Sequence, residues 1–131
     1  MPAYLKARST NASLTVNDVN LSLRFYTEGL GFEIADKHEQ DGKLSFVSLK
    51  AGEASLGIIQ DDFAKGRNRS KGVGVRFWLN TDQDINAVAN RVKKAGFALE
   101  NDPAPLPWGP VAFAVNDPDG YKITVANVAA H

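Results

Sequence analysis

Apolar and polar residues alternate along several short segments of the chain, with the two-residue period of strands that bury one face. In residues 12–17, Leu14 and Val16 share one face, while Ser13 and Thr15 share the other. Similar segments recur between turn residues such as Gly, Pro and Asp. The strands that we expect are residues 12–17, 32–40, 43–50, 54–60, 73–79, 97–101, 110–116 and 121–127.

Two further segments have the apolar spacing of amphipathic helices. The first follows Asp18 or Asn20, whose short side chains can cap a helix, and it ends at Gly31. The second follows Asp82 in the same way and ends at Gly96. Each predicted helix therefore lies between the first and second strand of its half of the chain.

The elements repeat the order β-α-β-β-β, once on each side of a polar segment. The first copy covers about residues 11–60, the linker about 61–72 and the second copy about 73–127. One helix over four strands cannot cover its own sheet well, so two copies side by side make the smallest stable core. We expect a single α+β domain over residues 1–131, in which two tandem modules form an open, partial barrel around a cavity.

Composition narrows the possible functions. The 131 residues are 44% hydrophobic and 23% charged, and the formal net charge is +0, so no overall field attracts nucleic acid or an anionic membrane. The lack of cysteine excludes disulfides, thiolate nucleophiles and cysteine-ligated metal centres. Neither a signal-peptide pattern nor a long apolar segment is present, and we therefore expect a cytoplasmic protein.

Several short motifs resemble the vicinal oxygen chelate superfamily, which contains glyoxalase I, extradiol dioxygenases and fosfomycin- and bleomycin-resistance proteins. They are Asn17-Asp18-Val19, Phe25-Tyr26, Leu30-Gly31-Phe32, Pro107-Trp108-Gly109 and Asp117-Pro118-Asp119-Gly120-Tyr121. The resemblance spans roughly residues 11–127 and implies paired modules around a central cavity, commonly assembled as dimers. In metal-dependent members, it also implies divalent-metal ligands on the first and last strand of each module.

The residues at those four strand positions are poor metal ligands. Asn11 is neutral and short, residues 56–58 offer no donor, the third position is Val75 or the permanently cationic Arg76, and the fourth is Thr124. The two histidines, at positions 38 and 131, are expected to be solvated. We therefore predict no metal, no cofactor and no catalytic residues, and the residues favour a binding protein over an enzyme.

Alternation also predicts which side chains face the cavity. They combine flat aromatic rings, fixed cations and hydroxyl groups, which suit a planar, partly anionic or hydrogen-bonding organic ligand. The candidate ligand-binding residues are Ser13, Thr15, Phe46, Arg76, Trp78, Trp108, Lys122 and Thr124. Structural roles are open for three of them: Trp78 in the core, Arg76 paired with a carboxylate, and Trp108 holding the fold.

Three functions follow from these expectations. The first, which we favour, is a metal-free small-molecule-binding protein of the glyoxalase/bleomycin-resistance type that sequesters a toxic or antibiotic ligand. The second is a divalent-metal-dependent lyase or dioxygenase of the same superfamily. The third is a structural or regulatory dimer without a ligand, which requires side chains to fill the face that carries Arg76 and Trp78. The expected partners are a small organic ligand and a second copy of the chain, with neither nucleic acid nor membrane.

Overall fold

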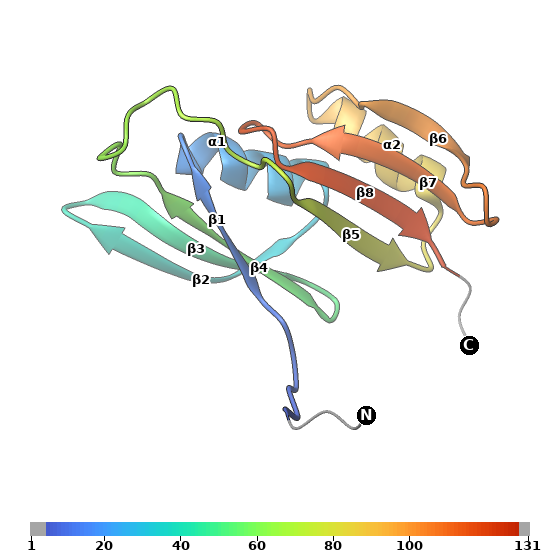
Figure 1. Cartoon of the computed structure of the whole chain (residues 1–131), viewed down its shortest axis with the longest axis horizontal. Coiled ribbons are helices and arrows are strands. Elements are labelled where there is room, and N and C mark those ends of the chain that lie inside the picture. The colour runs from blue at the N-terminus through green and yellow to red at the C-terminus, as the bar shows by residue number, and fades with distance from the viewer. Residues whose placement is uncertain (1–4, 129–131) are drawn as a thin grey trace.

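Two four-stranded sheets, each with helical turns against one face, lie side by side in the computed structural model, which describes residues 5–128 (Figure 1). The first module contains β1 (Ala12–Val16), α1 (Val19–Arg24), η1 (Phe25–Gly29), β2 (Glu33–Gln40), β3 (Lys43–Ala51) and β4 (Ala54–Gln60). The second contains β5 (Arg76–Thr81), α2 (Ile85–Lys94), β6 (Asn101–Pro105), β7 (Val111–Asn116) and β8 (Lys122–Asn127). No helix within the described residues is both long and apolar enough to span a membrane.

The two sheets have the same topology, with strand orders β1-β4-β3-β2 and β5-β8-β7-β6. The outer pairs β1/β4 and β5/β8 are parallel, and the remaining pairs are antiparallel. Neither sheet closes on itself, and the buried faces share one core that includes Val16, Ile58 and Phe113. The predicted fold class, two tandem β-α-β-β-β modules with open sheets, is therefore confirmed.

The first helix begins where its cap predicts. The Asp18 side chain accepts hydrogen bonds from the backbone N–H groups of Asn20 and Leu21, which satisfies free donors of the first turn. The helix then continues as the wider π-helical turn η1, in which hydrogen bonds join residues five apart. This turn directs Phe25 and Tyr26 into the core, where both are fully buried.

Three predicted boundaries were wrong in the second module. The strand β6 lies at residues 101–105 instead of 97–101, and it includes two prolines because an edge strand does not need every N–H. Phe97 instead packs edge to face on Phe25, with ring centroids 4.9 Å apart. Asp84, rather than Asp82, caps α2. The strand β5 begins at Arg76 rather than residue 73, since the preceding glycines have positive φ.

A buried hydrogen-bond network joins the β7–β8 turn to the first module. The Tyr26 hydroxyl donates to Asp117 Oδ2 at 2.8 Å, and Asp117 Oδ1 accepts from the backbone N–H groups of Asp119 and Tyr121. The Tyr121 hydroxyl in turn donates to the carbonyl of Thr15 on β1. Burial raises the pKa of Asp117, and burial together with the Asp117 charge raises the pKa of Tyr26. The Asp117 carboxylate therefore connects the first module to the β7–β8 turn of the second.

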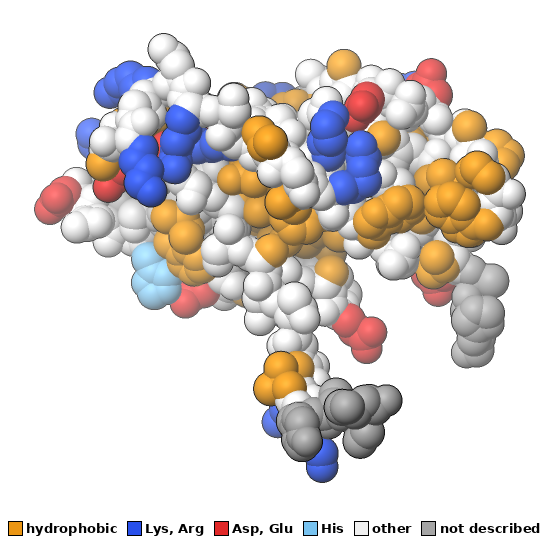
Figure 2. Space-filling view, in the orientation of Figure 1, with side chains coloured by type: hydrophobic (Ala, Val, Ile, Leu, Met, Phe, Trp, Pro, Cys, Tyr) orange, Lys and Arg blue, Asp and Glu red, His pale blue; other side chains and the backbone are white. Residues whose placement is uncertain are grey.

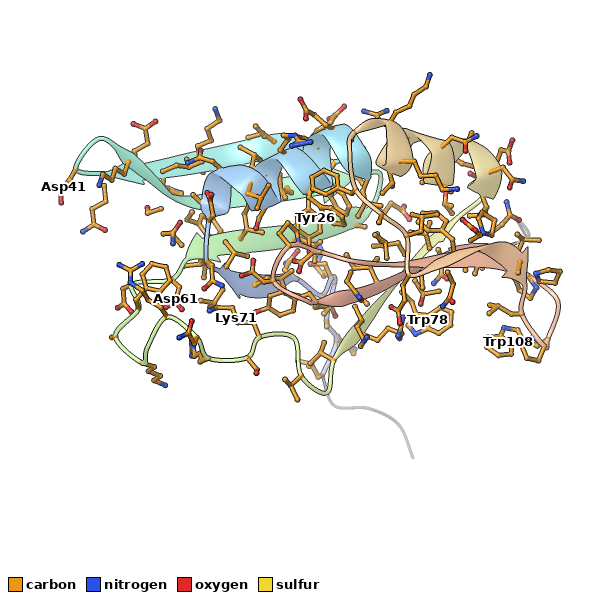
Figure 3. All side chains as sticks on the ribbon, turned by 90° about the horizontal axis from the view of Figure 1, so that it is seen from above. Tyr26, Asp41, Asp61, Lys71, Trp78 and Trp108 are labelled. Atoms are coloured by element: carbon orange, nitrogen blue, oxygen red, sulfur yellow. The ribbon has the colours of Figure 1, made fainter. Side chains whose placement is uncertain are left out.

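The linker between the modules is also bound to the first module by side-chain contacts. Lys71 Nζ lies 3.0 Å from Asp61 Oδ2 and donates to Asn17 Oδ1 at 2.7 Å, and the Lys71 and Asp61 side chains are only 4% and 5% exposed (Figure 3). The hydrogen bond from Lys71 is the main reason why the pKa of Asp61 falls to about 2. Arg69 adds a second cation 3.3 Å from the same carboxylate. A paired, buried ion of this kind orders the polar segment that the sequence predicts as a linker.

Candidate functional site

The face of the β5–β8 sheet that lies away from the helices carries Arg76 and Trp78. Both are on β5, two residues apart, and the parallel register places Arg76 beside Lys122 and Trp78 beside Thr124. The Arg76 Nη1 group donates to Thr124 Oγ1 at 2.8 Å. Four of the predicted ligand-binding residues therefore lie next to one another on two neighbouring strands.

Trp78 and Trp108 form a tilted aromatic pair on this face. Their ring centroids are 6.3 Å apart with planes at 45°, and both rings lie on the side of the sheet opposite the helices (Figure 3). The paired strands beneath them present small residues, Ala112, Ala114 and Ala126, all of which are buried. Trp78 nevertheless remains 45% exposed and Trp108 67% exposed. Neither tryptophan is a core residue, and both offer aromatic surface to solvent.

Positive charge lies next to this aromatic surface. Figure 2 shows Lys and Arg side chains beside a broad hydrophobic area on the part of the surface formed by the second module. Lys122 Nζ is 3.7 Å from Glu100 Oε1, a long and partly exposed ion pair. Within residues 5–128, no carboxylate lies within ion-pair distance of Arg76. The alternative role of Arg76 as partner of a carboxylate is therefore not seen.

The remaining predicted residues belong to the other sheet. Ser13 and Thr15 lie on β1, and the register through β4 puts Thr15 and Phe46 on the same face. The Phe46 ring covers Gly57, where a Cβ atom would meet the ring at 2.8 Å. The candidate residues therefore fall into two sets. The hydroxyl-bearing Ser13 and Thr15 lie with Phe46 on the first sheet, and the second sheet carries Arg76, Trp78, Lys122 and Thr124, with Trp108 beside Trp78.

The structure also shows how the four expected metal-ligand positions are used. At the first position, Asn11 Oδ1 accepts a hydrogen bond from the Ser55 hydroxyl, and at the second, Gly57 has no side chain and lies under the Phe46 ring. The third and fourth positions contact each other, because Arg76 donates a hydrogen bond to Thr124. A guanidinium cation and a neutral hydroxyl do not attract a divalent cation. The described residues contain no group of three or more His, Asp or Glu that could hold one, and His131 lies outside them. The donor set at these positions does not fit a metal ion.

An open groove of about 1130 Å³ lies between the two modules and reaches Trp78. Its walls combine the β3–β4 turn, the end of β5 and one side of α2, with Lys50, Asn80 and Arg91 among the polar residues. Sequence reasoning missed this groove. Asn80 could have been found because it continues the alternation of Arg76 and Trp78, whereas Lys50 and Arg91 reach it only through the packing of the modules.

Comparisons with known proteins agree with this architecture. The probable lactoylglutathione lyase of Vibrio cholerae is 30% identical over 136 residues, covering 95% of this chain and 94% of that protein. The lactoylglutathione lyase of Haemophilus influenzae is 27% identical and covers 84% of each chain. This chain is therefore similar in sequence to proteins that are named lactoylglutathione lyases.

Solved structures show the same fold. A glyoxalase-related enzyme from Fulvimarina pelagi superposes with a TM-score of 0.73 at 19% identity, covering 93% of this chain and 89% of the other. A superfamily member from Sphaerobacter thermophilus gives 0.72 at 24% identity, covering 94% and 98%. The model of the Glyoxalase/Bleomycin resistance protein/Dioxygenase superfamily matches residues 8–125. The resemblance seen in the sequence motifs is confirmed, and the chain belongs to this superfamily.

Proposed function

We propose that this protein binds a flat organic ligand on Trp78 and Trp108 without the help of a metal ion, as a sequestering member of its superfamily. The observation that carries the proposal is the exposed tryptophan pair beside an arginine that has no carboxylate partner in the described part of the chain. Aromatic rings with exposed faces and a few convergent polar groups are typical of small-molecule sites. A dimer without a ligand fits less well, because the described side chains leave both indole rings partly open.

Replacing Trp78 with alanine tests the proposal directly. We expect the affinity for an aromatic ligand, found by a thermal-shift screen, to fall by about 1–3 kcal/mol because a stacking partner is lost. Isothermal titration calorimetry measures the effect, and a thermal melt checks that the fold persists. Val73→Ala is the matched control, since Val73 is also apolar and exposed but lies before β5. Unchanged affinity in Trp78→Ala contradicts the proposal.

A metal-dependent lyase is the second candidate, and it is favoured by the relatives that are named lactoylglutathione lyases. The proposal predicts instead that added Zn²⁺, Ni²⁺, Mn²⁺ or Fe²⁺ leaves the melting temperature unchanged, because Arg76 repels a cation at this position. Metal analysis of protein purified without chelators gives an independent measurement. Near-stoichiometric metal, or strong stabilisation by one of these ions together with formation of lactoylglutathione, supports the lyase instead.

A further inference from the structure

Within residues 5–128, Arg24 pairs with Glu28 and Arg69 pairs with Asp61, whereas Arg76 has no carboxylate partner. Arg91 and Arg67 also lack a carboxylate, but Arg91 donates to backbone carbonyls and Arg67 lies over the Phe63 ring. Among the residues that the structure describes, the hydrogen-bond partner of the Arg76 guanidinium is the neutral hydroxyl of Thr124. Its positive charge is therefore oriented by the protein but not neutralised by it.

Thr124 holds the guanidinium in one place. The threonine is buried, with 6% of its surface exposed, and its hydroxyl accepts from Nη1 at 2.8 Å. A guanidinium has five N–H donors, so this bond leaves most of them free on an exposed side chain. A planar fork of free donors with a fixed orientation matches the two oxygens of a carboxylate.

The position of Trp78 selects which carboxylates fit. Residues two apart on a strand point to the same face about 7 Å apart, so a ring stacked on Trp78 directs a substituent towards Arg76. Lys122, beside Arg76 in the register, adds a second and only partly neutralised positive charge. The face therefore combines one aromatic platform with one anion-binding edge.

We propose that Arg76 binds the carboxylate of an aromatic acid whose ring lies on Trp78. A fixed guanidinium thereby recognises ligand oxygens at a strand position where metal-dependent relatives are expected to place a metal ligand. This inference rests on the proposed function and adds the chemical class of the ligand. It also assigns Thr124 as a positioning residue, because it orients Arg76 without carrying charge.

The test compares benzoate with benzamide, which has nearly the same shape but no charge. Both tryptophans of the chain lie at the site, so intrinsic tryptophan fluorescence excited at long wavelength reports on this face alone. We expect benzoate to bind at least about tenfold more tightly than benzamide, as a charge-assisted bond is stronger than a neutral one. In Arg76→Gln this preference should disappear, while the affinity for benzamide stays the same.

Two further variants show whether the preference for benzoate depends on the position of Arg76 or only on the total charge of the protein. Arg67→Gln removes the same charge from the linker between β4 and β5, where Arg67 lies over the Phe63 ring, and should keep the full preference for benzoate. Thr124→Val preserves the shape of the side chain but removes the hydroxyl, and it should lower the affinity for benzoate severalfold with benzamide unaffected. A thermal melt of each variant confirms that it is folded.

The outcomes distinguish this inference from the proposed function. Equal binding of benzoate and benzamide, with both lost in Trp78→Ala, overturns the role of Arg76 and supports ring binding. A preference for benzoate that survives in Arg76→Gln also overturns the inference. If neither compound changes the tryptophan fluorescence up to its solubility limit, both the inference and a ring-binding site on Trp78 are contradicted.

Discussion

Replacing Asp117 with alanine is expected to lower the free energy of unfolding by about 3 kcal/mol, one of the largest effects of any substitution outside the apolar core. The change removes the acceptor of the buried Tyr26 hydroxyl and of two backbone N–H groups in the β7–β8 turn. Buried donors without partners lose their hydration and gain nothing in return. Because the turn leads into β8, the loss should also loosen the strand that carries Lys122 and Thr124.

Chemical denaturation of the two proteins measures this difference. Asp102→Ala is the matched control, since it removes another aspartate carboxylate, one that pairs with Lys93 at 3.0 Å and whose side chain is 76% exposed. An exposed ion pair contributes at most about 1 kcal/mol, so this variant should be nearly as stable as the parent. If both variants lose the same small amount of stability, the carboxylate of Asp117 does not join the two modules.

Gly72→Ala should also destabilise the protein by about 3 kcal/mol, because two penalties act together at this position. The backbone of Gly72 has a φ of +74°, which side-chain-bearing residues rarely adopt. An added Cβ would also lie 2.8 Å from the Gly120 carbonyl oxygen and from the Tyr121 Cα atom. These are backbone atoms of the turn that Asp117 holds, so they cannot move aside without disturbing that network.

Gly74→Ala separates the two penalties. Gly74 has a similar φ of +77°, but a Cβ there would meet nothing within 4 Å. The backbone strain alone should cost about 1 kcal/mol. Thermal melts of both variants compare the positions in the same segment of chain. Equal losses would show that the linker is not packed tightly against the β7–β8 turn.

Alternation and turn residues were sufficient to predict most of the fold. The segment with Leu14 and Val16, and the repeat of one helix and four strands, depend on local patterns that a single sequence carries. The predictions failed where tertiary context overrides local preference. The prolines of β6 are tolerated because the strand lies at an edge, and the segment before Arg76 packs closely against the distant β7–β8 turn at Gly72.

Local sequence patterns were enough to predict the chemical groups available to this protein and, for side chains on the strands, the sheet face on which each one lies. No cysteine, few histidines and the order of residues along β5 and β8 suffice for that, because side-chain direction follows from the period of a strand. Which groups meet depends on tertiary contacts between residues distant in the chain. The contact between Trp78 and Trp108 and the hydrogen bond from Arg76 to Thr124 require the strands of the second module to pair in one register, and the groove requires the two modules to pack side by side.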